Sequence, residues 1–111
     1  MAAGTYNEDV NITTAGVTLQ GAGAANTIIM GLKDGADHGN TVTVSAPNVT
    51  VDGVTITRDG NDTADWNLTT LNDQGISLGA ANATLQNSII THNRNGVYVF
   101  NADGATIKNN D

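Results

Sequence analysis

The sequence predicts an all-β protein, a right-handed parallel β-helix of about three to four coils with three short strands in each coil. A six-residue motif occurs four times, and a short apolar segment precedes every copy. Gly, Asn, Thr, Ala and Asp dominate the 111 residues, and apolar residues nowhere keep a helical period over three turns. We therefore expect almost no helix.

The motif aligns without gaps at residues 16–21, 48–53, 82–87 and 104–109. Its pattern is Gly or Asn, then Val or Ala, Thr, an aliphatic residue, then Gln, Asp or Lys, and finally Gly or Asn. Two apolar positions separated by Thr indicate a strand with one buried face. Gly and Asn enter the left-handed backbone region at the lowest cost, so they predict sharp corners around each strand. The final positions give corners at Gly21, Gly53, Asn87 and Asn109.

Two further strands accompany the motif. One precedes each copy, at residues 10–12, 41–44, 75–78 and 96–99, and one follows the first three copies, at residues 27–30, 54–57 and 88–91. Three strands per unit, each stacking on its counterpart, predict three parallel sheets. We expect the interior to hold two columns, Val17, Val49, Ala83 and Ala105 in one and Leu19, Val51, Leu85 and Ile107 in the other. The threonines between them, Thr18, Thr50, Thr84 and Thr106, should form an outward column.

Two other folds are compatible with short strands. A left-handed β-helix needs a six-residue period throughout, which this sequence lacks. An antiparallel sandwich needs hairpin turns at regular intervals. The Asp52-Gly53 pair suits such a turn, but its three counterparts suit it less well.

The formal net charge is −7, with only four basic residues. This charge argues against nucleic acid and anionic membranes as partners and favours cations, above all calcium, or polysaccharides. No apolar run approaches the roughly 20 residues needed to cross a bilayer, and no cysteine is present. We expect an extracellular or cell-surface location, with the export signal outside this sequence.

The chain is expected to be one β-helix segment, residues 1–111, with open ends. Neither end shows the polar capping repeat that usually covers a terminal coil of a solenoid. A bare coil invites pairing with further strands. The chain is therefore either a fragment of a longer solenoid, in contact with neighbouring coils, or a unit that stacks end to end as a homo-oligomer.

Long connections gather after the third strand of each unit, at residues 31–40, 58–74 and 91–95. Stacking would place them on one face, which commonly marks the binding side of a solenoid. The candidate ligand-binding residues there are Trp66, Arg58, His92, Arg94 and His38. Trp66 could stack on a sugar ring or anchor its own loop against the coil, and polar loops are also common without a ligand.

The acidic stretch at residues 59–65 is the candidate cation site. Asp59, Asn61, Asp62 and Asp65 offer oxygen ligands at short spacing, which is the chemistry that calcium prefers. The spacing does not match an EF-hand loop, because the central Gly and the terminal Glu are absent. A solvated acidic loop explains the same residues.

Residues 3–12, 17–23 and 27–31 resemble the opening coil of the pectin-lyase-like superfamily, in particular the opening of pectinesterases. Residues 96–102 and 105–110 are similar to the carbohydrate-binding and sugar-hydrolysis repeats of that superfamily. The resemblance implies the β-helix fold and a polysaccharide as partner. The aspartate pair and arginine of pectinesterases have no counterpart here, and neither has the Tyr-Gly-x-Asp-Pro-His motif of alginate epimerases.

Three functions follow from these observations. The first is a non-catalytic module that binds a polysaccharide or a partner through its stacked loops. The second is a truncated piece of a polysaccharide lyase, epimerase or esterase whose catalytic coils lie outside this chain. The third is a structural solenoid that stacks end to end. We expect the chain by itself not to be an enzyme.

Overall fold

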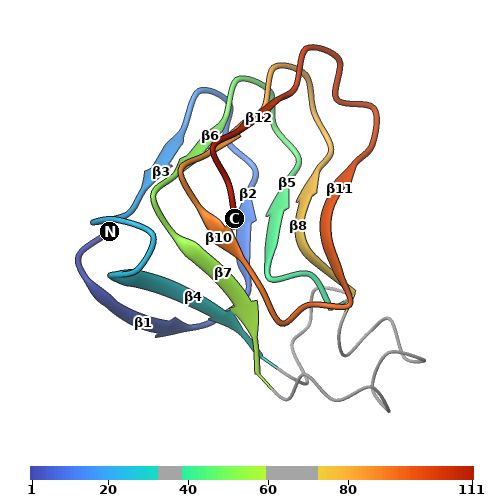
Figure 1. Cartoon of the computed structure of the whole chain (residues 1–111). Coiled ribbons are helices and arrows are strands. Elements are labelled where there is room, and N and C mark those ends of the chain that lie inside the picture. The colour runs from blue at the N-terminus through green and yellow to red at the C-terminus, as the bar shows by residue number, and fades with distance from the viewer. Residues whose placement is uncertain (33–38, 60–72) are drawn as a thin grey trace.

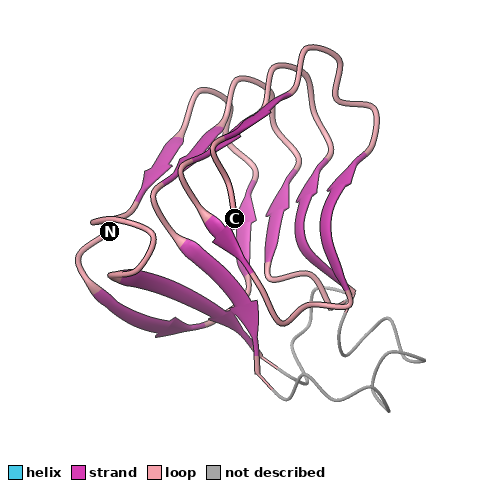
Figure 2. Cartoon of the chain, in the orientation of Figure 1, coloured by secondary structure: helices cyan, strands magenta, loops and turns pink. Residues whose placement is uncertain are grey.

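The chain folds as a right-handed parallel β-helix, as the repeat predicts. The computed structural model describes residues 1–32, 39–59 and 73–111. Over these residues all strands belong to three sheets, each of four parallel strands, and no helix occurs (Figures 1 and 2). Every pairing between these strands is parallel, which excludes the antiparallel sandwich.

The strands follow one another in a fixed order around each coil. The first sheet contains β1 (Gly4–Asn7), β4 (Thr27–Gly31), β7 (Thr55–Arg58) and β10 (Ile89–Ile90). The second contains β2 (Val10–Ile12), β5 (Val42–Val44), β8 (Gln74–Leu78) and β11 (Asn95–Val99). The third contains the motif strands β3 (Thr18–Gln20), β6 (Thr50–Asp52), β9 (Thr84–Gln86) and β12 (Thr106–Lys108).

Strand β1 was not among the predicted strands. It pairs with β4, placing Tyr6 beside Ile29, which in turn lies beside Ile56 of β7. The segment before Val10 therefore supplies the first strand of the first coil. The sequence pattern did not reveal this strand, because residues 4–7 are mostly polar and only Tyr6 faces the interior column of Ile29 and Ile56.

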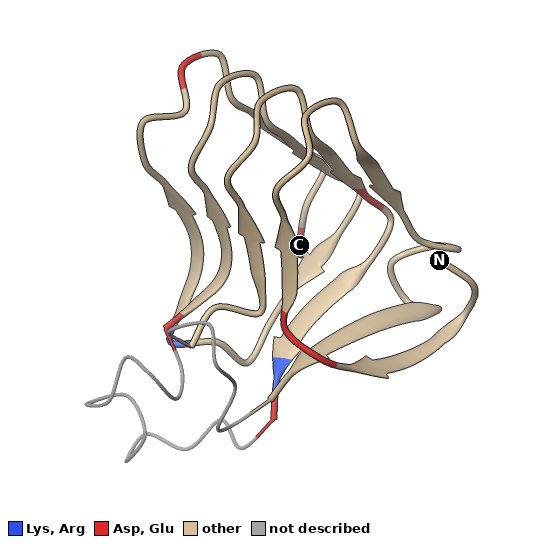
Figure 3. Ribbon diagram, turned by 180° about the vertical axis from the view of Figure 1, so that it is seen from behind, with Lys and Arg blue, Asp and Glu red and all other residues tan. Residues whose placement is uncertain are grey.

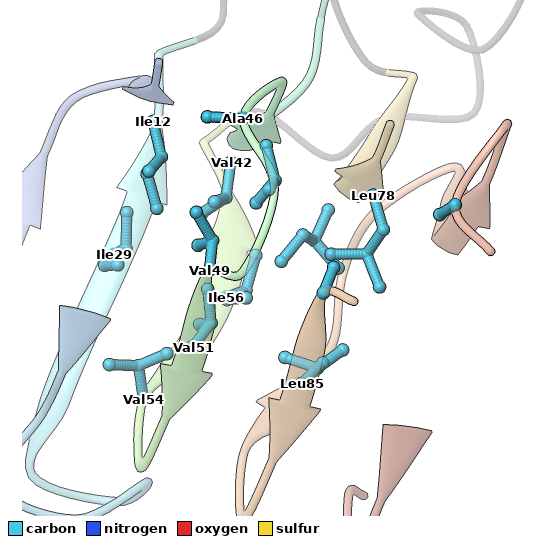
Figure 4. Packing of buried hydrophobic residues seen from close by; sticks show 14 residues of the cluster. Ile12, Ile29, Val42, Ala46, Val49, Val51, Val54, Ile56, Leu78 and Leu85 are labelled. Atoms are coloured by element: carbon cyan, nitrogen blue, oxygen red, sulfur yellow. The ribbon is translucent and has the colours of Figure 1, made fainter. Parts of the chain in front are cut away.

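The interior is a stack of aliphatic side chains contributed by all three sheets (Figure 4). Strand pairing puts Leu19, Val51, Leu85 and Ile107 in one column, as predicted. Val51 and Leu85 are fully buried, whereas Ile107 in the last coil is 47% exposed. Val49 and Ala83 are buried as well, while Val17, Leu19 and Ala105 of the terminal coils are only partly buried. The prediction thus holds for the inner coils and weakens in the first and last coils, which have a neighbouring coil of this chain on one side.

The corner before each motif strand adopts the left-handed conformation in every copy. The φ angles are 76° at Gly16, 59° at Asn48, 58° at Asn82 and 76° at Gly104. After the strand, Gly53, Asn87 and Asn109 also have positive φ, of 69°, 52° and 55°.

The prediction of a left-handed corner at Gly21 was wrong. Gly21 is not among the residues with positive φ. A Cβ atom there would lie 2.3 Å from the Gly53 carbonyl oxygen and 2.7 Å from a Val54 methyl carbon. Glycine is required at this corner by the close approach of the next coil.

The outward face of the third sheet carries the predicted threonine column, since Thr18, Thr50, Thr84 and Thr106 are successive partners in the pairing. Polar side chains beside it bond along the axis from one coil to the next. Asn82 donates to the Asn48 side chain at 3.2 Å, and Gln86 donates to Asp52 at 3.1 Å. These bonds hold the coils in register. The described residues contain no helix that could cross a membrane.

Candidate functional site

The long connections meet at the corner between the first and second sheets, as the sequence predicts. Their described ends are joined by backbone hydrogen bonds of 2.9 Å, from Asp73 N to Gly39 O and from Asn95 N to Asp73 O. Asp59 N donates to Gly31 O at the same distance. We call this region, residues 8–9, 31–32, 39–41, 58–59, 73–74 and 91–95, the loop corner. It lies where β4 and β7 end and where β5 and β8 begin (Figure 1).

Several candidate residues lie outside the described residues. These are His38, Trp66 and three of the four proposed calcium ligands, Asn61, Asp62 and Asp65. Their proposed roles stay predictions. Arg58, Asp59, His92 and Arg94 are described and can be placed.

Arg58 is buried, which corrects its assignment as a surface ligand-binding residue. Its side chain is inaccessible, and its Nη1 atom lies 3.1 Å from Oδ1 of Asp9. Its Nη2 atom donates to the carbonyl oxygen of Leu32. The same Asp9 oxygen accepts the backbone N–H of Leu32 at 3.1 Å. Arg58, at the end of β7, therefore links the turn that contains Asp9 to the segment at Leu32 through buried hydrogen bonds.

Asp9 is a structural partner that sequence analysis missed. It lies in the first coil, 49 residues from Arg58, and only 9% of its side chain is exposed. Gly31 leaves the space for this pair, because a Cβ atom there would lie 2.6 Å from Arg58 Nη1 and 2.8 Å from Asp9 Oδ1. No local pattern links these positions, so only the stacking of coils brings them together.

Arg94 and His92 lie at the outer end of the loop corner. Arg94 Nη1 is 3.4 Å from Oδ1 of Asp73, and the Arg94 side chain remains 34% exposed. The side-chain amide of Asn95 also donates to this carboxylate oxygen, at 3.4 Å. His92 is exposed, has a φ of 57°, and its Nδ1 atom is 2.9 Å from the Thr91 hydroxyl. Figure 3 shows basic segments beside acidic ones at this corner.

Asp59 is the only member of the proposed calcium set among the described residues, and it is exposed. Within the described ranges, no three His, Cys, Asp or Glu side chains come close enough to hold a metal ion. The fit of calcium to the acidic stretch thus depends on residues 60–65.

An exposed aromatic pair follows the loop corner along β11. The rings of Tyr98 and Phe100 are stacked, with centroids 6.1 Å apart and planes 10° apart, and the two residues are 47% and 53% exposed. Tyr98 faces outward because it pairs with the outward Ser77, while its neighbours Val97 and Val99 pair with the buried Ile76 and Leu78. Sequence analysis singled out only Trp66, although the alternation of residues 97–100 carried the signal.

This arrangement suits binding. In the described part of the corner, the Asp73 carboxylate is already bonded to Arg94 and Asn95, and the Asp9 carboxylate is buried against Arg58. The groups at the surface of this region include the carboxylates of Glu8 and Asp59, the His92 imidazole and the exposed part of the Arg94 guanidinium, and the two rings lie beyond them at the end of β11. Aromatic faces pack on apolar ring faces, and these polar groups bond hydroxyl or carboxylate oxygens.

Residues 3–111 match the family model of NosD, which is described as a periplasmic copper-binding protein. The chain belongs to the NosD family. No curated protein matches the sequence.

Solved structures similar to this NosD-family chain are pectin methylesterases. PemA from Erwinia chrysanthemi aligns with a TM-score of 0.72 and 18% identity over 96% of this chain and 38% of its own. The enzyme from Yersinia enterocolitica aligns with a TM-score of 0.70 and 22% identity over 96% of this chain and 39% of its own. A pectin methylesterase in complex with a hexasaccharide aligns with a TM-score of 0.70 and 18% identity, over 88% of this chain and 35% of its own. At these identities the likeness shows the pectin-lyase-like fold alone, and the chain spans little more than a third of each enzyme.

Proposed function

We propose that this chain is a non-catalytic β-helix module of an exported protein, and that it binds a polysaccharide through its last coil and loop corner. The observation that carries the proposal is the stacked, half-exposed pair of Tyr98 and Phe100. Two aromatic rings stacked at the end of a strand offer an apolar platform to sugar rings at little entropic cost, because an aromatic side chain has only two rotatable bonds.

The surroundings of the pair support this ligand class. His92 and Arg94 lie in the turn before β11, which carries Tyr98 and is directly followed by Phe100, so polar groups able to bond sugar hydroxyls or carboxylates belong to the same coil. The net charge of −7 disfavours nucleic acid as the alternative polymer. The hexasaccharide complex of a pectin methylesterase adds that a protein of this fold accommodates an oligosaccharide. The description of NosD as periplasmic supports an exported protein.

A glycan array with the purified chain tests the proposal. We expect binding to one or a few polysaccharide classes, and at least about a fivefold weaker affinity for Tyr98→Ala and for Phe100→Ala. Stacking of a nucleic-acid base on an aromatic ring contributes on the order of 1–3 kcal/mol, and the same scale for a sugar ring corresponds to a change of roughly fivefold or more. Trp66→Ala belongs in the same series, because its loop could supply a second ring.

Ile107→Ala is the matched control for these variants. Ile107 is as exposed as Tyr98, at 47%, and belongs to the same coil, but it pairs with the inward-facing Leu85. Its replacement should leave glycan binding unchanged. A wild-type chain that binds no polysaccharide, or a Tyr98→Ala variant that binds as well as the wild type, refutes the proposal.

Calcium at residues 59–65 is a further part of the proposal, supported by the four oxygen-bearing side chains Asp59, Asn61, Asp62 and Asp65. We expect millimolar calcium to raise the melting temperature, EDTA to reverse this, and Asp62→Asn to abolish it, because a ligand of the folded state stabilises it by mass action. Asp103→Asn, an exposed carboxylate at another corner, is the control. If calcium leaves the melting temperature of the wild-type chain unchanged, the proposed calcium site is refuted.

Copper does not fit the described residues as a bound metal. Copper sites use His, Cys or Met ligands. The sequence has no cysteine, His92 is the only histidine among residues 1–32, 39–59 and 73–111, and no three His, Cys, Asp or Glu side chains gather there. Our proposal therefore assigns no copper site to these residues.

A second candidate function is that of a scaffold piece of a larger polysaccharide-modifying enzyme. It is favoured by the alignment, in which the chain covers 35–39% of the length of three pectin methylesterases. Elimination and ester-cleavage assays on the 111-residue chain separate the two candidates. Turnover by this chain alone would overturn the non-catalytic module.

A further inference from the structure

The turn between β10 and β11 holds one residue in an uncommon backbone conformation. His92 has a φ of 57°, which lies in the left-handed region. Among the described residues, every other non-glycine residue with positive φ is an asparagine. Asn enters this region at low cost because its short side chain bonds the local backbone, whereas a larger side chain is strained there. His92 therefore lies at a position of the kind that the rest of the chain fills with Asn or Gly.

The two neighbours of His92 impose this conformation. Thr91 N donates to the carbonyl oxygen of Ile56 in the preceding coil at 3.0 Å, and the side chain of Asn93 donates to the same oxygen at 3.2 Å. The Asn93 amide also donates to the Thr91 carbonyl oxygen across the turn, at 2.8 Å. These bonds fix the backbone on both sides of His92, so the turn itself needs no imidazole.

The fold gains little from the His92 side chain. His92 is exposed, and within the described part of the chain its ring makes one hydrogen bond, between Nδ1 and the Thr91 hydroxyl at 2.9 Å. This bond is made with the adjacent residue, so it joins no two segments of the solenoid. A strained residue whose side chain does not support the fold indicates a function for that side chain.

The bond to Thr91 leaves Nε2 as the ring nitrogen that a ligand can reach. When the Thr91 hydroxyl donates to Nδ1, the ring proton lies on Nε2, which then donates to an acceptor oxygen. Arg94 follows two residues later and keeps 34% of its side chain exposed. The turn thus offers a donor nitrogen and a partly exposed guanidinium in the coil that carries the aromatic pair.

We propose that His92 recognises an acceptor oxygen of a bound oligosaccharide through Nε2, and that Thr91 positions its ring. This inference rests on the glycan-binding function proposed above and adds a requirement for ligand length. Asn95 and Tyr98 lie three residues apart on β11, about 10 Å at the usual rise of an extended strand. A monosaccharide on the aromatic pair therefore does not reach the turn, and only a longer glycan contacts both.

Substitutions at His92 separate recognition from folding. His92→Asn and His92→Gly should leave the melting temperature unchanged or higher, because both residues suit a left-handed backbone. The probe is a glycan array of neutral and uronate oligosaccharides, from disaccharide to hexasaccharide. Both variants should bind its longer members about fivefold more weakly than the wild type, which is the scale of one hydrogen bond. The shortest members that the wild type binds should bind these variants equally well.

The two groups of oligosaccharides distinguish the acceptor. A His92 effect on neutral members identifies a sugar hydroxyl as the acceptor, and an effect confined to uronate members identifies a carboxylate.

The role of Thr91 is tested by its own pair of variants. Thr91→Val removes the hydroxyl that orients the ring and should weaken binding of the longer glycans, whereas Thr91→Ser keeps the hydroxyl and should bind as the wild type does. Asn48→Gly is the control, because Asn48 has a φ of 59° at a corner on another side of the coil. It should leave glycan binding unchanged.

Two results overturn the role of His92 and leave the glycan-binding function standing. One is a His92→Asn variant that binds every glycan as tightly as the wild type while Tyr98→Ala loses binding. The other is a His92→Asn variant with a clearly lower melting temperature, which shows that the imidazole supports the fold. A wild-type chain that binds no member of the array refutes the glycan-binding function, and this inference with it.

Discussion

Glycine serves two different purposes at the end of the repeated motif. Gly53 has a φ of 69°, and a Cβ atom there would meet nothing closer than 3.5 Å. Its requirement is conformational, so Asn takes its place in the later copies as Asn87 and Asn109, both with positive φ. Gly21 is instead limited by space, because the Gly53 carbonyl oxygen is 2.3 Å from its virtual Cβ. Glycine at the last motif position is therefore required for its backbone conformation at Gly53 and for its small size at Gly21.

Substitutions at Gly53 test whether this position requires a left-handed backbone conformation or merely a small side chain. Gly53→Val should lower the free energy of unfolding by about 1–3 kcal/mol, because a β-branched residue holds a left-handed conformation only under strain. Gly53→Asn should cost much less, since Asn tolerates this conformation. Urea denaturation measures both.

Thr50→Val, on the exposed side of the same strand, is the control and should change stability only slightly. Gly21→Asn should be costly, in contrast to Gly53→Asn, because Asn brings a side chain into occupied space. If Gly53→Val lowers the free energy of unfolding no more than Thr50→Val does, the left-handed conformation at Gly53 is not required by the coil.

At the scale of elements, the buried pair of Arg58 and Asp9 ties the end of β7 to the turn between β1 and β2. It joins the first coil to the third, and the second coil contributes the carbonyl of Leu32, directly after β4, and the space above Gly31. Because Arg58 is the last residue of β7, the pair fixes the point at which the chain leaves this strand.

Removal of one partner should be more damaging than removal of both. Asp9→Ala removes the carboxylate bonded to the buried Arg58 guanidinium and should lower the free energy of unfolding by about 3–5 kcal/mol. The double variant Asp9→Ala with Arg58→Met should recover part of this loss, because the buried guanidinium is removed as well. A double-mutant cycle by urea denaturation gives the coupling, and purely additive effects would show that the two groups do not interact.

At the scale of the whole molecule, stability should be graded along the axis. Apart from the Arg58–Asp9 pair, the strand pairings join each coil to its neighbours, and inner residues such as Val44, Val51 and Leu78 are at most 1% exposed, whereas Val99 and Ile107 of the last coil are 46% and 47% exposed. Terminal coils can therefore open without the rest of the solenoid.

Hydrogen exchange should reveal this gradient in the chain at low concentration. We expect the slowest amides in β5, β6 and β8, and much faster exchange in β11 and β12. Mass spectrometry of peptides from each coil measures the protection. Uniform protection along the chain would mean that the solenoid opens only as one unit.

The parts of the fold that repeat were predictable from the sequence. Four aligned motifs gave the coils, their register and the inward columns, and the positions of the long connections gave the loop corner. The parts of the candidate site that do not repeat were not predictable in the same way. Arg58 looked like a surface cation in a polar loop, and only its distant partner Asp9 explains why it is buried.

By itself, the sequence determined the solenoid, because periodic apolar positions and Gly or Asn corners act locally and identically in every coil. The tertiary structure alone decided which charged groups remain at the surface, and which glycine needs a left-handed backbone and which needs space. Those outcomes depend on contacts between residues one or two coils apart. The separation of such residues along the chain varies with the loops, so no pattern within a single coil encodes their contact.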